Sequence, residues 1–368
     1  MTSLTSSVEI KANGPDPPVG YNDKDTGRKG GAIKSTELSK RWKEIKWPDV
    51  LDGKITSNRL FVRSAIIRKD LLPRFASKHQ LPSKCVDSVE DVKSFIDQLN
   101  RKNSATFEEN SFPTESEETS CKNNVGDSRY CGYVLKPTDS SNAFGVVFFD
   151  DPLVDARVRE SLATHGTMVL QPYPKPYLYG DKYKFHIRTM MLLVGDLDVY
   201  VHKKPRVLIA TNDWVTNHHN WVDELTHITN QSANRKSKEY DESKQNVKFH
   251  GPQCGFPPEF LAESFLQMKN IVKALFKDIL DEETGAKKSE FLPLRTTYEL
   301  FGIDFLIDKN GIVYLLEINP EPSMKLFHME KQEQMVGADP FVRVPSTFTR
   351  VYSKQMLNAM KLLKKHRG

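Results

Sequence analysis

Tyr298-Glu-Leu-Phe-Gly-Ile-Asp-Phe-Leu-Ile-Asp-Lys-Asn-Gly-Ile-Val-Tyr-Leu-Leu-Glu-Ile-Asn319 is the stretch that decides the fold of this 368-residue chain. It contains two apolar runs, at 298–307 and 312–318, separated by Asp308–Gly311. Asp, Asn and Gly are the residues that tolerate the positive φ angles of a tight turn. Two apolar runs joined in this way predict a β-hairpin.

Three polar side chains interrupt the two apolar runs: Asp304, Glu317 and Asn319. A carboxylate in a buried strand is costly unless something compensates its charge. Glu317 and Asn319 are two residues apart, so both point to one face of a strand. Pairing around the turn can bring Asp304 close to them. Two carboxylates and an amide oxygen suit a hard cation such as Mg²⁺. The alternative is that the two acids pair with buried Lys or Arg side chains.

The motifs of the hairpin resemble those of a known family. Gly-x-Asp-Phe at 302–305 and Glu-Ile-Asn-x-x-Pro at 317–322 look like the metal-binding end of an ATP-grasp ligase. The longer pattern is similar to that of the tubulin-tyrosine ligase family. Lys-Tyr-Lys-Phe-His-Ile-Arg at 182–188 and Thr-His-Ile-Thr-Asn at 226–230 support the same resemblance. It covers about 130–325, with a fainter match near 59–75.

The resemblance implies an α/β (α+β) chain with an ATP-grasp fold of antiparallel sheets, preceded by a small N-terminal domain. It also implies an ATP-dependent carboxylate–amine ligase that uses ATP and Mg²⁺. Such an enzyme adds a free amino acid to an acidic protein tail, such as that of tubulin, through an acyl phosphate. Asp304, Glu317 and Asn319 would hold the Mg²⁺. Two alternatives stay open: a catalytically weakened ATP-grasp module that binds within a cytosolic assembly, and a ligase for a non-tubulin acidic protein.

Composition limits the cellular setting. Hydrophobic residues make up 38% of the chain and charged residues 27%, which is ordinary for a soluble protein. No apolar run reaches the roughly 20 residues of a membrane span, and the N-terminus lacks a signal-peptide pattern. The four cysteines have no Cys-x-x-Cys spacing, which favours a reduced, cytoplasmic setting. A net charge of +5 is too modest to indicate nucleic acid but is compatible with an acidic partner. Association with microtubules is implied by the resemblance alone.

Composition along the chain predicts five segments. These are a disordered tail (1–35), an N-terminal domain (36–105), a flexible insertion (106–128), an ATP-grasp domain (129–330) and a C-terminal helical segment (331–368). Apolar stripes predict helices at 88–99, 151–165, 257–280 and 348–363. Residues 231–249 are polar and highly charged, and we expect them to form a mobile loop.

Two lysines are candidates for binding phosphate. Lys136 stands near the end of a predicted strand at 132–137, before a loop of small residues and a return strand at 145–149. In the resembling proteins a lysine at this place offsets phosphate charge. The loop here has Gly145 as its single glycine. Lys69 lies in a segment that resembles one placing a lysine toward the nucleotide. A solvated basic helix end is the alternative for Lys69.

The predicted strand at 167–173 ends in Gln171-Pro-Tyr-Pro174. The resemblance implies that this is the hinge that reads adenine with main-chain groups, and it makes Gln171 and Tyr173 nucleotide-binding candidates. Proline has no N–H, so Tyr173 is the one possible main-chain donor within 172–174. The double proline departs from the usual hinge.

A long strand predicted at 182–194 carries Lys184, His186 and Arg188 on one face, because they are spaced by two. Such a face needs an anion opposite. The resemblance implies that Lys184 contacts nucleotide and that Arg188 contacts the acidic acceptor. It makes Lys136, Lys184 and Arg188 the catalytic candidates. His186 stands where the family has Asp, and a neutral imidazole could hydrogen-bond a ribose hydroxyl.

Three further residues complete the set of candidates. Arg206 is the counterpart of a second substrate-side arginine in the resembling family, with a solvated strand-edge arginine as the alternative. Thr229 and Asn230 resemble residues near the ribose and phosphates, so we expect both to contact nucleotide.

Overall fold

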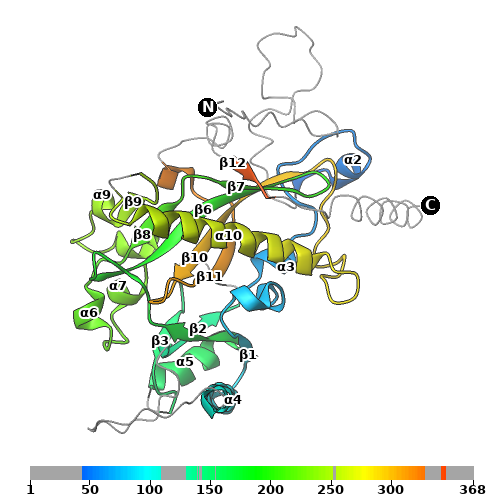
Figure 1. Cartoon of the computed structure of the whole chain (residues 1–368). Helices are drawn as coiled ribbons and strands as arrows, with labels where there is room; N and C mark the ends of the chain where they lie inside the picture. Colours follow the sequence, from blue (N-terminus) through cyan, green and yellow to red (C-terminus); the bar gives the residue numbers. More distant parts are fainter. Residues whose placement is uncertain are drawn as a thin grey trace.

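The computed structural model describes residues 44–108, 130–138, 140, 143–153, 155–251, 254–327 and 341–344, with the backbone alone for 102–108 (Figure 1). The predicted tail at 1–35, most of the insertion at 106–128 and the helix predicted at 348–363 lie outside these residues. The described part is an α+β structure in which every pair of named strands is antiparallel.

A large sheet forms the centre of the molecule (Figure 1). Its strand order is β11-β10-β6-β7-β12, and β5 and β8 also pair with β6, while β9 extends from β8. The bounds of these strands are β5 (Leu178–Tyr179), β6 (Tyr183–Val194), β7 (Asp198–His202), β8 (Arg206–Ile209), β9 (Asn246–Lys248), β10 (Tyr298–Ile307), β11 (Val313–Pro320) and β12 (Phe341–Arg343).

A smaller sheet has the order β1-β4-β2-β3. Its strands are β1 (Lys84–Val86), β2 (Tyr130–Pro137), β3 (Val147–Phe149) and β4 (Met168–Pro174). Helices α4 (Val89–Glu108) and α5 (Ala156–His165) pack against it and share its hydrophobic core. Helix α4 continues past the predicted segment boundary at 105. Helix α5 begins at Ala156 rather than at 151, because the side chain of Asp155 caps it by accepting from the Arg157 N–H.

The predicted hairpin is confirmed. Strands β10 and β11 pair so that Asp304 lies opposite Glu317 and Gly302 lies opposite Asn319. The turn between them contains Gly311 at φ +80°, a backbone conformation that favours glycine. A bulge after Asp304 shifts the register. Sequence spacing and turn chemistry therefore place the three polar residues of the hairpin together.

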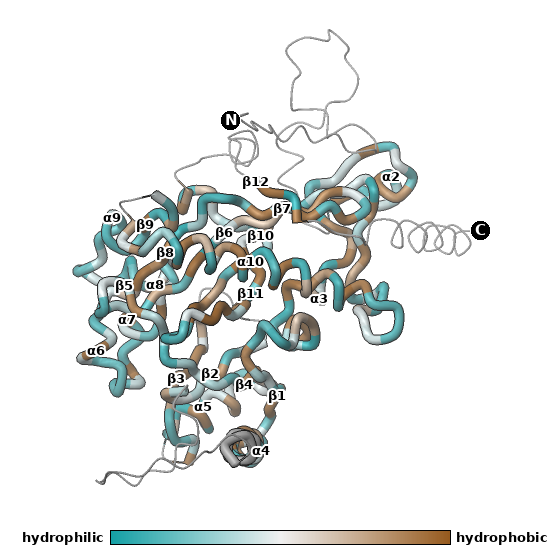
Figure 2. Tube along the Cα trace, in the orientation of Figure 1, coloured by the Kyte–Doolittle hydropathy of each residue, from teal (hydrophilic) through white to brown (hydrophobic). Residues whose placement is uncertain are grey.

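The long helix α10 (Pro258–Ile279) covers one face of the large sheet, as the apolar stripe at 257–280 predicts. Its buried residues pack against odd-numbered residues of β6 and β10, including Phe185, Ile187, Ile303 and Phe305. Figure 2 shows the hydrophobic residues gathered on these strands and along α10. Because side chains alternate between the two faces of a strand, the even-numbered residues of β6 and β10 lie on the opposite face, which faces the small sheet.

Residues 36–105 contribute to three of the hydrophobic clusters. Leu60, Ile66 and Phe75 join the core under α10, and Trp47 packs with Leu292. Strand β1 and helix α4 join the core of the small sheet. Short elements carry this segment across the molecule: α2 (Trp47–Leu51), α3 (Ser64–Ile67), η2 (Leu72–Arg74) and η3 (Ser77–His79). The described N-terminal residues are therefore buried against the predicted ATP-grasp region.

The expectation that residues 231–249 form an irregular loop is wrong. This segment contains α8 (Gln231–Asn234), α9 (Glu242–Gln245) and β9, which pairs with β8. The buried Asn234 accepts from the Thr211 hydroxyl and donates to the Ile228 carbonyl. Polar side chains that satisfy buried backbone groups give this segment order despite its composition. Two short helices, α6 (Trp214–Asn217) and α7 (Glu224–His227), precede it, and η4 (Met324–Phe327) follows β11.

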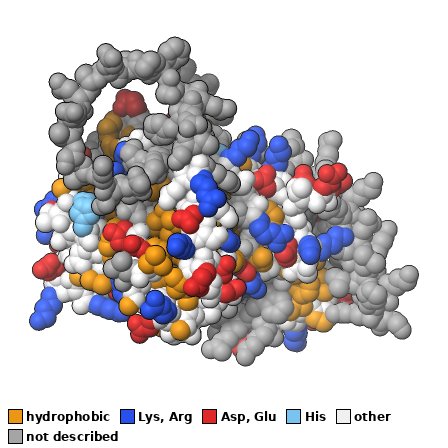
Figure 3. All heavy atoms as spheres, turned by 90° about the horizontal axis from the view of Figure 1, so that it is seen from below, with side chains coloured by type: hydrophobic (Ala, Val, Ile, Leu, Met, Phe, Trp, Pro, Cys, Tyr) orange, Lys and Arg blue, Asp and Glu red, His pale blue; other side chains and the backbone are white. Residues whose placement is uncertain are grey.

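The described surface is mixed in charge. Figure 3 shows Lys, Arg, Asp and Glu side chains interspersed over the face seen from below, with hydrophobic side chains between them. Among the described residues no helix is long and apolar enough to cross a membrane.

Candidate nucleotide and metal site

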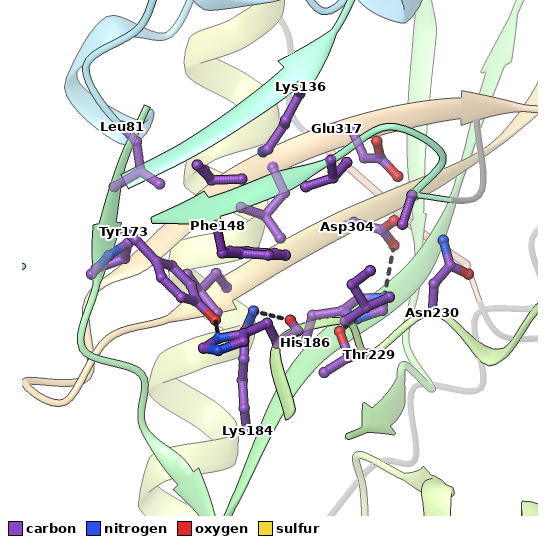
Figure 4. Close-up of a pocket in the computed structure, with 18 of the residues that line it drawn as sticks. Leu81, Lys136, Phe148, Tyr173, Lys184, His186, Thr229, Asn230, Asp304 and Glu317 are labelled. Carbon is purple, nitrogen blue, oxygen red and sulfur yellow. Dashed lines mark hydrogen bonds and ion pairs between the residues drawn. The ribbon is translucent and has the colours of Figure 1, made fainter. Parts of the chain in front are cut away.

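A pocket of about 130 Å³ lies between the two sheets. Nine of the residues predicted for the site line it: Lys69, Lys136, Tyr173, Lys184, His186, Thr229, Asn230, Asp304 and Glu317. Four predicted residues are not part of the lining: Gln171, Arg188, Arg206 and Asn319. Figure 4 shows Lys136 and Lys184 on opposite sides, Tyr173 at one end, and Asp304 and Glu317 toward the other.

Lys136 enters the pocket from β2 of the small sheet. Its Nζ donates to Oε1 of Gln171 at 2.7 Å, and Gln171 donates in turn to the Ser83 hydroxyl at 2.7 Å. Burial lowers the pKa of Lys136 to about 8, the Glu317 carboxylate opposes this shift, and the charge of Lys69 adds to it. Gln171 therefore orients the lysine by its side chain, in addition to the main-chain role predicted for it.

Lys184 enters from β6 of the large sheet. Its Nζ donates to the His227 carbonyl at 2.5 Å and lies 4.5 Å from the ring centre of Tyr173 and 5.3 Å from that of Phe148. These neighbours are neutral, so they offset little of the cost of burying a charge. Burial accordingly lowers the pKa of Lys184 to about 7. Among the described residues Lys184 has no carboxylate partner, so an anion in the pocket would meet an uncompensated cation here.

His227, which the site prediction did not include, organises this end of the pocket. Its ring stacks on Phe148 at 5.0 Å and on Trp221 at 5.3 Å. Nδ1 lies 3.3 Å from the Tyr173 hydroxyl and Nε2 lies 3.1 Å from the Asn220 carbonyl. Burial, aided by the charge of Lys184, lowers the pKa of His227 to about 3. The neutral ring thus carries its proton on Nε2, where it meets a carbonyl, and Nδ1 accepts from the tyrosine.

Asp304, Glu317 and Asn319 converge at the other end. The Asn319 amide group donates to Asp304 Oδ2 at 3.1 Å and to Glu317 Oε1 at 2.9 Å. Arg188 makes a two-pronged ion pair with Asp304, through Nε and through Nη2 at 2.5 Å. Burial would raise the pKa of Asp304, but the charge of the Arg188 guanidinium and its hydrogen bonds outweigh burial and hold that pKa well below its usual range. Asp304 is therefore a carboxylate at all ordinary pH values.

This end of the pocket fits a hard cation. Asp304 and Glu317 accept hydrogen bonds from the same Asn319 amide group, so their carboxylates are close enough to bind one cation. If the Asn319 amide is rotated by 180°, its oxygen faces the cation in place of its nitrogen. Asp304 can serve a cation while Arg188 remains paired, because a carboxylate has about four lone-pair positions. No group of three or more His, Cys, Asp or Glu side chains suited to a metal occurs among the described residues. The pair of acids with an asparagine is thus the candidate set.

His186 stands between the two ends, on the same face of β6 as Lys184. Its Nδ1 lies 2.5 Å from the Thr229 hydroxyl, and its Nε2 lies 3.6 Å from Asp304 Oδ1, too far for a direct hydrogen bond. The nearby carboxylate favours the tautomer with the proton on Nε2. Thr229 then donates to Nδ1, so both predicted residues line the pocket as one pair.

Lys69 ties the N-terminal segment to the loop over the pocket, because its Nζ donates to the Ser140 carbonyl. This contact places Lys69 at the lining of the pocket, with its ammonium beside the loop that follows β2. Ser141 and Asn142 of the same loop lie outside the described residues. Asn230 lines the pocket, and its backbone starts helix α8.

Arg206 lies opposite Arg188 in the pairing of β8 with β6, on the same face of the sheet. Its Nε donates to Asn246 Oδ1 at 2.8 Å and its Nη2 donates to the Asn246 carbonyl at 2.9 Å. The side chain is 5% exposed, so it is a buried residue rather than a solvated strand-edge arginine. The structure brings Arg206 next to Arg188 but not into the pocket.

Apolar residues of the lining were missed in the sequence. Val134 and Leu306 line the pocket because they lie two residues from Lys136 and Asp304, respectively, on the same strand face. The spacing of two residues could have predicted that Val134 and Leu306 line the pocket. Leu316 lines the pocket beside Glu317, although neighbouring residues of a regular strand face opposite ways. The bulge that allows this was not visible in the sequence.

Comparison with known proteins agrees with this geometry. The model of the tubulin-tyrosine ligase family matches residues 57–336. The probable tubulin--tyrosine ligase PBY1 of Saccharomyces cerevisiae is 30% identical over 151 residues, which are 39% of this chain and 19% of that protein. The probable tubulin polyglutamylase TTLL2 of Mus musculus is 29% identical over 202 residues, 53% of this chain and 35% of that protein.

A third relative aligns over more of its length. The probable tubulin--tyrosine ligase C12B10.04 of Schizosaccharomyces pombe is 25% identical over 301 residues, 72% of this chain and 70% of that protein. This chain therefore spans a minor part of the first two relatives and about two thirds of the third.

A solved structure shares the fold. The C-terminal domain of Kluyveromyces lactis Pby1, an ATP-grasp enzyme that interacts with the mRNA decapping enzyme Dcp2, superposes with a TM-score of 0.51 at 19% identity and covers 83% of this chain and 86% of that chain. The predicted antiparallel ATP-grasp fold is thus confirmed. Because the family model matches well over half of the 368 residues, this chain belongs to the tubulin-tyrosine ligase family.

Proposed function

We propose that this protein is an ATP-dependent carboxylate–amine ligase that adds an amino acid to an acidic protein tail. The observation that carries the proposal is that one pocket contains two lysines, of which Lys184 is buried and Lys136 partly buried, and two carboxylates at its other end. Lys136 and Lys184 enter from opposite sheets, and Asp304 and Glu317 lie beyond them. This order suits a polyphosphate with a metal ion at its far end.

The chemistry follows from the poor reactivity of a carboxylate. An oxygen of the acceptor carboxylate attacks the terminal phosphorus of ATP, ADP leaves, and an acyl phosphate forms. The amine nitrogen of the incoming amino acid then attacks the carbonyl carbon, phosphate leaves, and the nitrogen loses a proton. Lys136 and Lys184 would hold the phosphates in line. Mg²⁺ bound by Asp304, Glu317 and Asn319 would supply charge stabilisation for the transferred group.

The adenine end of the pocket is apolar and aromatic. Phe148 and Tyr173 form its walls, and the two prolines beside Tyr173 leave few main-chain donors. The Phe148 and Tyr173 rings contact each other, with centres 5.0 Å apart, so a flat base would stack on the exposed face of this aromatic wall and not between the two rings. His186 and Thr229 would face the ribose. Because Nε2 of His186 lies too far from Asp304 for a direct hydrogen bond, it would donate to a ribose hydroxyl instead.

The acceptor would lie on the side of Arg188. This arginine already holds one carboxylate through both prongs of its guanidinium, so its geometry suits recognition of another. The names of the relatives make the acidic tail of tubulin the first acceptor to try, with a place on microtubules as a consequence. Which amino acid is joined is left for the assay to decide.

A test of the proposal measures ADP release in the presence of single amino acids, with tubulin, with tubulin stripped of its acidic tails, and with no protein acceptor. We expect release that needs both intact tubulin and one amino acid. ADP release that does not depend on tubulin but depends on another acidic protein would identify that protein as the acceptor. No amino-acid-dependent release with any acceptor would refute a ligase.

A paired measurement tests the role of Arg188. Arg188→Lys keeps the positive charge but loses the planar fork, which pairs with Asp304 and which we propose also meets the acceptor carboxylate. Ligation to the tail should therefore fall at least tenfold while nucleotide affinity changes by less than about threefold. Arg74→Lys is the matched control, because Arg74 is an exposed arginine paired with Glu290. If ligation and nucleotide affinity fall together, Arg188 serves the metal end of the pocket and not the acceptor.

A second candidate function is binding without catalysis. It is favoured by His186 at a position where the resembling family has an acid, and the fold neighbour from Kluyveromyces lactis is described as interacting with a decapping enzyme. This reading keeps nucleotide binding and predicts no ligation. The ADP-release assay above separates the two candidates.

A further inference from the structure

Four charged side chains form a cluster outside the pocket lining, at the junction of the N-terminal segment with the hairpin. Arg59 and Arg63 stand in the stretch around α3, Glu299 lies on β10, and Glu321 follows the end of β11. The two arginine side chains are 11% and 13% exposed, and Glu299 is 1% exposed. Arg59, Arg63 and Glu299 are largely removed from solvent, so their charges have to be balanced by one another or by Glu321.

Glu299 alone cannot balance the cluster. Its Oε2 accepts from the Leu60 N–H at 2.8 Å, and its Oε1 faces both guanidinium groups, in an ion pair with Arg63 and at 3.7 Å from Nη1 of Arg59. One carboxylate thus serves two arginines. Burial and the neighbouring charge of Arg59 lower the pKa of Arg63 to about 10, and the buried Nε of Arg59 has no hydrogen-bond acceptor in the described part of the chain.

Glu321 supplies the second negative charge, but it is held loosely. Its Oε1 lies 3.1 Å from Nη1 of Arg59, while the side chain is 60% exposed. Its backbone has φ +57°, an unfavourable value for a residue other than glycine. An ion pair exposed to this extent contributes little to stability. An outside carboxylate that reached Arg59 would therefore displace Glu321 at small cost and gain a partly desolvated guanidinium.

Glu321 links the cluster to the end of the hairpin that lies near Arg188. A Cβ atom placed on Gly302 would lie 3.1 Å from Pro322 and 3.3 Å from the Arg188 side chain, so both pack over the same glycine. Glu321 precedes Pro322 and comes two residues after Asn319 of the metal end. Pro322 and Glu321 therefore connect the cluster to the strand face that carries Arg188, while Glu299, an odd-numbered residue of β10, lies on the α10 side of the sheet.

We propose that Arg59 and Arg63 form a second carboxylate-binding position at the end of the hairpin, which Glu321 occupies until a substrate carboxylate replaces it. This inference rests on the proposed ligase function and names the site that would hold a further acidic group. The carboxylate belongs either to a neighbouring acidic residue of the acceptor tail or to the free amino acid. Both present the same charge and the same two oxygens.

Two variants test the position in opposite directions. Glu321→Gln removes the internal competitor from an exposed turn, so it should tighten carboxylate binding roughly two- to fivefold. Arg59→Gln removes a charged donor and should weaken the same binding roughly tenfold or more. Arg74→Gln and Glu282→Gln are the controls, since Arg74 is exposed in the same N-terminal segment and Glu282 is exposed after α10. Neither control should change the binding.

The readout is direct binding, independent of turnover, with Mg²⁺ and a non-hydrolysable ATP analogue present throughout. A labelled glutamate-rich peptide reports the tail, and calorimetry with free tyrosine, glutamate or glycine reports the amino acid. Opposite shifts of the two variants in the peptide measurement assign the position to the tail; opposite shifts in the amino-acid measurement assign it to the amino acid. If Glu321→Gln leaves both affinities unchanged, the proposal is overturned, whatever the folding of the arginine variant. Failure of the ligase proposal would appear separately, as absent ADP release in the wild type.

Discussion

The substitution of Lys184 by Met gives the sharpest test of the pocket. Lys184 has a pKa of about 7 against its usual 10.5, mainly because it is buried. That difference corresponds to about 5 kcal/mol of unfavourable charging in the folded protein. Methionine has a similar length and no charge, so the variant avoids this cost. It also loses the ammonium that we expect to meet phosphate.

The sign of the pH effect follows from the lowered pKa. Between about pH 7 and 10.5 the unfolded chain binds the Lys184 proton more readily than the folded protein does. The stability of the ligand-free wild type therefore falls as the pH drops through this window, and the penalty is complete below about pH 7. Lys184→Met should be more stable than the wild type at pH 7 by up to a few kcal/mol, and this advantage should vanish toward pH 10.5.

Nucleotide binding should change in the opposite sense. Loss of a charge-assisted contact costs about 1.5–3 kcal/mol, so affinity at pH 7 should fall roughly ten- to a hundredfold. At pH 8 Lys184, with a pKa of about 7, is about nine-tenths neutral, and Lys136, with a pKa of about 8, is about half neutral. Binding of a polyphosphate should therefore take up protons at both lysines in the wild type, and the variant should take up nearly one proton less. Calorimetry in two buffers of different ionisation enthalpy measures both quantities.

The matched control is Lys182→Met, two residues earlier in the chain. Lys182 is half exposed, pairs with Asp213 at 3.4 Å and does not line the pocket. Its replacement should leave nucleotide affinity and proton uptake unchanged. The reasoning about Lys184 fails if its variant loses less than twofold in affinity, if the Lys182 variant loses as much, or if the wild type takes up no proton.

Three other predictions concern single residues. Lys136→Ala should weaken nucleotide binding roughly ten- to a hundredfold, and a calorimetric change below twofold would return Lys136 to a structural role. Glu317→Gln should leave the thermal unfolding midpoint within a few degrees but weaken Mg·ATP binding, so unchanged affinity would argue against the metal assignment. Gly132→Ala should destabilise the fold by about 1–3 kcal/mol, because the added Cβ would lie 2.7 Å from both the Trp221 ring and the Phe149 carbonyl. An unchanged urea midpoint would contradict that packing.

The hairpin and its site were readable in the sequence because they depend on local rules. A period of two places Glu317 with Asn319 and Lys184 with His186, whatever the rest of the fold does. A turn of Asp, Lys, Asn and Gly sets the pairing that brings Asp304 opposite Glu317. Helix α10 was equally visible, since its apolar stripe repeats over six turns. These features need no information from distant segments.

The partners of these residues could not be read in the same way. Arg188 was expected to point toward the acceptor, and it makes its two-pronged contact with Asp304, 116 residues later. His227 carries the carbonyl that holds Lys184; it lies within the motif at 226–230, but the motif did not show that its backbone would meet Lys184. The order of residues 231–249 likewise depends on pairing with β8. Each of these outcomes is a contact between segments that the sequence keeps apart.

The sequence by itself therefore determined which side chains could do the chemistry and on which strand faces they lie. Periodicity and turn residues act within a few positions, so one chain segment suffices to define them. The tertiary structure decided which charges neutralise one another. It sets Lys184 among neutral aromatic groups and Arg188 against Asp304, and it leaves Arg59 and Arg63 to share Glu299. The free energy of a charge depends on burial and on neighbours brought from elsewhere in the chain, and only the folded arrangement of the two sheets supplies both.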